Sequence, residues 1–83
     1  MTVLYFSWVK EKIGLSEETV TPPADVQTVA ALMAWLAGRS AGHAAAFADT
    51  RTIKAAVDQV HAPPTASIAD AREVAFFPPV TGG

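Results

Sequence analysis

The residues best suited to chemistry stand in the last stretch of the sequence, "FFPPVTGG" at 76–83. Gly82 and Gly83 carry no side chains, so they could enter a channel too narrow for other residues. An α-carboxylate on Gly83 would be ionised at neutral pH and would be a poor electrophile. Acyl chemistry at this carboxylate would therefore need activation, most simply as an acyl-adenylate made by a separate ATP-using enzyme.

The residues before the glycines predict an extended arm. Pro78 and Pro79 lack a backbone N–H, so they would end the preceding strand and favour a polyproline-like form. Val80 and Thr81 would then project from the domain with the glycine pair. Six extended residues after Phe77 span about 20 Å, enough to thread a buried active site in another protein. A functionless chain end is the alternative.

The rest of the sequence offers no second reactive group. It has no cysteine, and His43 and His61 are its only histidines, far apart along the chain, so a metal site is not expected. The eight carboxylates show no acid and base pair, and the serines lie in no nucleophile elbow. We expect the chain itself to bind no metal or cofactor, with ATP used only by the activating enzyme.

Length and composition predict one folded domain. The 83 residues are 51% hydrophobic and 17% charged, which is too apolar for a disordered segment. The net charge is −2 and the six lysines and arginines are scattered, which argues against nucleic acid as a partner. No stretch matches a secretory leader or the roughly 20 apolar residues of a membrane span. The cytoplasm is the expected location.

Periodicity predicts the order strand, strand, helix, strand, loop, strand. Thr28 would cap the main helix, which ends near Gly38, and an alanine-rich stretch would form a short second helix. This order predicts an α+β fold of the ubiquitin-like β-grasp class, a mixed sheet with one main helix on one face. The domain would cover 1–77 and the arm 78–83. The predicted strands are 2–9, 17–21, 52–60 and 72–77, with 40–50 as the short helix and 61–71 as the loop.

The predicted strands carry more apolar side chains than one buried face can hold. If 2–9 is a regular strand, Val3, Tyr5 and Val9 face the helix, and Phe76 and Phe77 must point to opposite faces of the sheet. The other face would collect a set of large apolar residues. This outer set could be covered by the 59–72 loop, but an exposed patch that docks a partner explains the set better. Its members are Leu4, Phe6, Trp8 and Phe77.

The stretch "VAFFPPVTGG" at 74–83 resembles the C-terminal signature of molybdopterin synthase small subunits, a family of ubiquitin-like sulfur carriers. The resemblance continues more loosely through "VLYFSWVKEKIG", "TVAAL" and "AAVDQ". Two departures are visible. Asp58 stands where the family commonly has Asn, and "ADAREV" replaces an acidic turn with glycine before the last strand, which affects that turn but not the arm.

The resemblance implies a chemical role for the arm. Gly83 would be adenylated by a ubiquitin-activating-like adenylyltransferase and converted to a thiocarboxylate. The sulfur would pass to cyclic pyranopterin monophosphate inside the large subunit, where the catalytic residues are expected, and two rounds would build the dithiolene of molybdopterin. Phe77 and the outer set would dock the large subunit and the activating enzyme in turn. Two small and two large subunits would assemble.

Three other functions stay open from the sequence. A sulfur carrier of thiazole synthesis has the same fold and a glycine pair but usually lacks the "FFPP" approach. A protein modifier would be joined to lysines through Gly83. A plain β-grasp binding module would have an inert arm.

Overall fold

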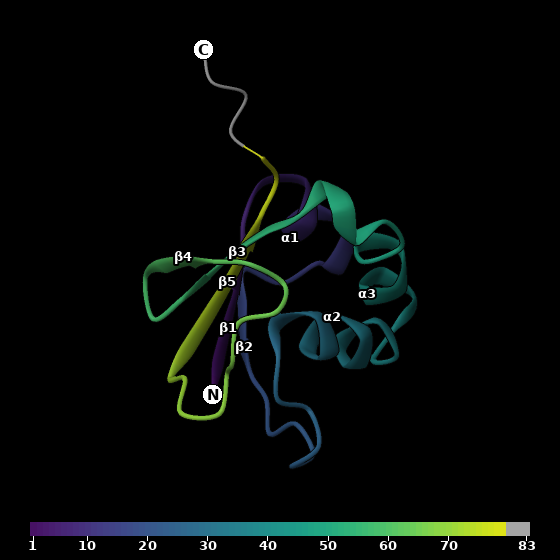
Figure 1. The fold of residues 1–83 in the computed structure, drawn as a ribbon. Coiled ribbons are helices and arrows are strands. Elements are labelled where there is room, and N and C mark those ends of the chain that lie inside the picture. The colour runs from purple at the N-terminus through teal and green to yellow at the C-terminus, as the bar shows by residue number, and fades with distance from the viewer. Residues whose placement is uncertain (80–83) are drawn as a thin grey trace.

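The computed structural model describes residues 1–79, and the predictions made for Val80, Thr81, Gly82 and Gly83 lie outside them. The sheet has five strands in the order β2-β1-β5-β3-β4. β5 lies parallel to β1 and antiparallel to β3, so the predicted mixed sheet is confirmed (Figure 1). The strands are β1 (Thr2–Tyr5), β2 (Glu17–Thr19), β3 (Lys54–Val57), β4 (Val60–Ala62) and β5 (Glu73–Phe77).

The helices lie together on one side of this sheet (Figure 1). The Thr28 side chain accepts a hydrogen bond from the Ala31 amide and caps α2, as predicted, and the Ser40 side chain caps α3 in the same way. Both predicted helices are therefore present, in the β-grasp arrangement expected from the sequence. The helices are α1 (Ser7–Ile13), α2 (Val29–Ala37), α3 (Ala41–Ala46) and the 3₁₀ helix η1 (Thr50–Thr52).

The prediction of one strand over 2–9 is wrong beyond Tyr5. Ser7 has φ 55°, which breaks the strand, and α1 then runs to Gly14, whose φ of 88° ends it. The apolar residues also fit a helix, because Val9 is buried and Ile13, four residues later, packs against the core. β1 and β2 pair antiparallel, with Leu4 opposite Glu17, and α1 connects them.

The prediction of one strand over 52–60 followed by a loop over 61–71 is wrong where the two segments meet. Asp58 and Gln59 have φ values of 48° and 70° and form a two-residue turn between Val57 and Val60, so His61 lies in β4. Positive φ at both positions is the type I′ pattern that favours glycine, and this turn contains none. The Asp58 carboxylate instead accepts hydrogen bonds from the backbone N–H groups at the start of β5.

The core lies between the helices and the inner face of the sheet. Val3, Tyr5 and Phe76 point inward as predicted, while Val9 reaches the core from α1. The ring of Phe76 lies 5.3 Å from that of Phe47 in an edge-to-face contact. The largest fully buried side chains are those of Tyr5, Phe76, Leu32, Leu36, Val3, Val9, Val29 and Val74.

α1 and α3 approach each other closely at Gly42. A Cβ atom added to Gly42 would lie 2.5 Å from the backbone oxygen of Lys12 and 3.2 Å from the Cα of Ile13. Neither backbone atom can move without shifting α1. The absence of a side chain at Gly42 therefore sets the distance between the two helices.

We expect Gly42→Ala to lower the free energy of unfolding by about 1 to 3 kcal/mol, because overpacking outweighs the gain in helix propensity. Gly38→Ala is the matched control, since its Cβ would meet only the Trp35 oxygen, at 3.6 Å. This control should leave stability nearly unchanged. Urea unfolding followed by circular dichroism measures both, and a Gly42→Ala protein as stable as wild type would refute the close contact.

Candidate functional site

The arm begins at the centre of the sheet, at the end of β5. Phe76 is fully buried, and its carbonyl accepts a hydrogen bond from the Phe6 N–H at 3.1 Å. Phe77 is half-buried and Pro79 is exposed. The prediction that the adjacent phenylalanines take opposite faces is confirmed, and the base of the arm is held by strands on both sides.

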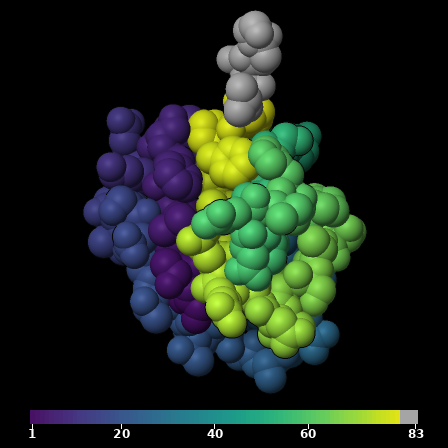
Figure 2. Space-filling view, turned by 90° about the vertical axis from the view of Figure 1, so that its left-hand side faces the viewer, coloured from purple at the N-terminus to yellow at the C-terminus, as the bar shows by residue number. Residues whose placement is uncertain are grey.

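The 59–72 segment, which was the alternative cover for the outer face of the sheet, does not lie across this face as a loop. β4 extends the sheet at its edge, and the later residues of that loop bond backbone to backbone with the start of α2, from Ile68 N to Gln27 O and from Val29 N to Ala66 O. Figure 2 shows this face, with β1 in purple, β5 in yellow and the β3–β4 hairpin in green. Within residues 1–79 the outer face is therefore only partly covered, with Ala75 buried and with Leu4, Ala56 and Phe77 half-buried.

Leu4, Ala75 and Ala56 lie side by side across this outer face, because Ala75 is the registered partner of both others. Phe77 lies two residues beyond Ala75 on the same face. The His61 ring stands edge-on to Phe77, with ring centroids 5.4 Å apart. The small residues in the middle leave a shallow apolar strip, with Leu4 and Phe77 as its large members.

The other two predicted docking residues are placed differently. Phe6 lies at the start of α1 and is 48% exposed, which makes it one of the few exposed large apolar side chains. Trp8 is not on the outer face, which corrects the prediction. It lies on α1, half-buried against the core, where it lines a hollow with Lys12 and Ala45. The structure therefore brings Leu4 and Phe77 to one face but separates Trp8 from them.

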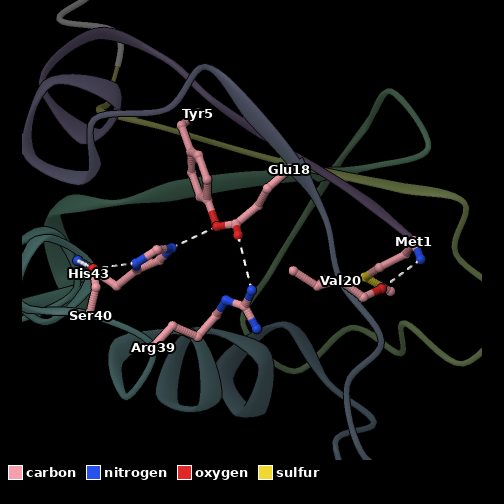
Figure 3. A network of polar contacts seen from close by, with 7 residues as sticks. All are labelled: Met1, Tyr5, Glu18, Val20, Arg39, Ser40 and His43. Atoms are coloured by element: carbon pink, nitrogen blue, oxygen red, sulfur yellow. Dashed lines mark hydrogen bonds and ion pairs between the residues drawn. The ribbon is translucent and has the colours of Figure 1, made fainter.

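A polar network that the sequence did not reveal centres on Glu18 (Figure 3). Its carboxylate accepts a hydrogen bond from Tyr5 Oη at 2.7 Å and pairs with His43 Nε2 at 2.6 Å and with Arg39 at 3.2 Å. Ser40 Oγ lies 2.7 Å from His43 Nδ1. The network joins β1 and β2 to the helix layer. No local motif could have indicated it, because its members are far apart along the chain.

The contacts of Glu18 shift two ionisation equilibria. Burial alone would raise the pKa of Glu18, but the hydrogen bonds with His43 and Tyr5, aided by the charge of Arg39, hold that pKa below its ordinary value. Burial, and then the hydrogen bond to Glu18, raise the pKa of Tyr5 well above its ordinary value. Among the described residues no buried side-chain nitrogen or oxygen lacks a partner, so the network is fully satisfied and has a structural role.

Comparison with known proteins identifies the family. The model of the ThiS family matches residues 3–83. The chain belongs to the ThiS family. It is 42% identical over 81 residues to the molybdopterin synthase sulfur carrier subunit of Escherichia coli (strain K12), an alignment that covers 98% of this chain and 96% of that protein.

The fold of this ThiS-family chain also has a solved counterpart. The crystal structure of SAMP1 from Haloferax volcanii superposes with a TM-score of 0.71 at 23% identity, covering 99% of this chain and 97% of that one. The likeness confirms the ubiquitin-like β-grasp fold. Among residues 1–79, no group of three or more His, Cys, Asp or Glu side chains is placed to hold a metal ion. None of the helices in this part of the chain is long and apolar enough to cross a membrane.

The lowered pKa of Glu18 predicts a pH-dependent contribution to stability. Because the pKa is lower in the folded chain, this contribution is complete above the ordinary glutamate pKa of about 4.3 and is lost as pH falls through the folded value. Glu18→Gln should therefore cost about 1 to 3 kcal/mol at pH 7. The difference from wild type should shrink below about pH 4.5.

Urea unfolding at a series of pH values tests this expectation. Glu17→Gln, at the exposed neighbouring position on β2, is the control and should have little effect at any pH. A difference between wild type and Glu18→Gln that does not change with pH would show that the ionised carboxylate is not what stabilises the network.

Proposed function

We propose that this chain is the sulfur carrier subunit of a molybdopterin synthase and that it carries sulfur as a thiocarboxylate on Gly83. The observation that carries the proposal is the 42% identity, over nearly the full length of both proteins, with the E. coli molybdopterin synthase sulfur carrier subunit. The match to the ThiS family extends to Gly83 itself. The sequence "FFPPVTGG" is consistent with a slender arm that enters a partner.

The proposed chemistry starts from an unreactive carboxylate. In a ubiquitin-activating-like enzyme, a Gly83 carboxylate oxygen attacks the α-phosphorus of ATP, and pyrophosphate leaves. A sulfur nucleophile then attacks the acyl-adenylate carbon and displaces AMP, which leaves sulfur on the glycine carbonyl. The thiocarboxylate sulfur attacks a carbon of cyclic pyranopterin monophosphate in the large subunit and displaces an oxygen substituent of that carbon, which forms a thioester. Hydrolysis then breaks the acyl C–S bond, restores the Gly83 carboxylate and leaves the sulfur on the pterin. A dithiolene holds two sulfurs, so two rounds are needed.

The described part of the chain supports this role through its outer face. Phe77 and Leu4, both half-buried, lie on an apolar strip next to the base of the arm, and Phe6 is exposed nearby. A partner that takes the arm would contact these residues at the same time. We place the catalytic residues of this reaction in the large subunit. We place the assembly in the cytoplasm as two small and two large subunits.

Intact mass of the protein isolated from cells with an active sulfur-transfer pathway tests the thiocarboxylate. We expect a fraction of the chain to show replacement of one oxygen by sulfur, because activation exchanges an atom only at the terminal carbonyl. Deletion of Gly83 should abolish both this mass change and the activity of molybdenum enzymes in the same cells. An unmodified mass together with full molybdenum-enzyme activity in the deletion strain would rule out the proposal.

The same experiment separates the alternatives that the sequence left open. A carrier for thiazole synthesis would also show the sulfur exchange, but deletion of Gly83 would then cause a thiamine requirement instead of loss of molybdenum-enzyme activity. A protein modifier would appear as adducts on lysines of other proteins. The 42% identity with the E. coli molybdopterin synthase sulfur carrier subunit favours the molybdopterin pathway.

Adjacent phenylalanines allow docking to be tested apart from folding. Phe77→Asp should leave the fold intact and raise the dissociation constant of the large-subunit complex by at least about ten-fold, because it places a charge in an apolar contact. Phe76→Ala should instead cost about 3 to 5 kcal/mol of stability. Circular dichroism and calorimetric binding measure the two effects, and a Phe77→Asp chain that unfolds would assign Phe77 to the core.

A further inference from the structure

A pocket of about 390 Å³ opens beside Phe77 at the edge of the sheet. Its walls are mostly apolar, and no carboxylate from residues 1–79 lines it. The two polar groups in its lining both carry nitrogen, a lysine amine and an imidazole. The lining residues are Lys54, Ala55, His61, Ala62, Pro63 and Phe77.

Lys54 is the cross-strand partner of Phe77, so its ammonium group lies on the same face as the phenylalanine that is proposed to dock. His61 contacts Phe77 from the other side of the pocket, edge to face. Both Lys54 and His61 are exposed. Within residues 1–79 neither side chain makes a hydrogen bond or an ion pair, whereas Arg39 and Arg51 are each paired with a carboxylate.

We propose that this pocket binds an acidic side chain, Asp or Glu, of the large subunit, with Lys54 as its ion-pair partner. This inference rests on the function proposed above and names the chemistry of the partner at the base of the arm. The carboxylate would lie between the Lys54 ammonium and the His61 ring. Phe77 and the two alanines would exclude water from the pair, which strengthens an interfacial ion pair.

The charges argue against a second copy of the chain as the occupant. In a symmetric dimer the same patch meets itself, so Lys54 would approach the Lys54 of the partner copy. Like charges at an interface are unfavourable, and the described residues of the lining include no carboxylate to compensate them. An acidic group on a different protein satisfies the pocket without this cost.

Calorimetric titration of the purified chain into its large subunit tests the proposal. Lys54→Glu should raise the dissociation constant at least about ten-fold, and Lys54→Gln should raise it less, because it removes attraction without adding repulsion. The wild-type dissociation constant should rise with salt more steeply than that of Lys54→Gln. Arg72→Glu is the matched control, since it makes the same charge change at an exposed position beyond the opposite end of β5, and it should bind like wild type.

The outcomes distinguish this inference from the function on which it rests. If Phe77→Asp abolishes binding while Lys54→Glu binds as tightly as wild type, the acidic contact is wrong and the proposed function stands. If Gly83 never carries sulfur and neither variant alters binding, the proposed function itself fails. Sedimentation of the free chain checks for the other occupant, because Lys54-dependent self-association would assign the pocket to a second copy and overturn the proposal.

Discussion

The pairing of β5 with a strand on each side is the constraint on which the rest of the structure depends. β5 lies between β1 and β3, parallel to the first and antiparallel to the second. Both edges of its backbone are therefore hydrogen-bonded, and its alternating side chains contribute to the core on one face and to the apolar strip on the other. Phe76 and Phe77 take their different environments from this placement.

The sequence predicted a helix or strand correctly where one hydrophobic pattern dominated. It was misleading where strand alternation and helical spacing overlapped. Thr28 with apolar residues at helical spacing predicted α2, and "REVAFF" predicted β5. Residues 7–9 continued the strand alternation of 2–9 but also fitted helical spacing with Ile13, and the chain turns into a helix at Ser7, where φ is positive. β4 was missed because the turn at Asp58 and Gln59 adopts a glycine-type conformation without glycine.

The parts of the site that could not be predicted depend on contacts distant in sequence. Glu18 meets Tyr5 and His43 across separations of 13 and 25 residues, and no local spacing encodes such a meeting. The pocket beside Phe77 likewise needs β3, β4 and β5 in register before Lys54 and His61 become neighbours of the same ring. The arm, in contrast, was readable from the sequence because its residues are consecutive.

The type I′ turn at Asp58 and Gln59 also has a consequence for how the molecule can diversify. The Asp58 carboxylate in this turn accepts hydrogen bonds from the amides of Arg72 and Glu73, at the end of β5 that is far from Phe77. These bonds attach the β3–β4 hairpin, at the outer edge of the sheet, to β5. The hairpin is thus anchored at one end, while its other end carries the Lys54 and His61 side chains that line the pocket. Substitution of Lys54 or His61 can therefore change the chemistry of the pocket, while the Asp58 contacts with β5 are left in place.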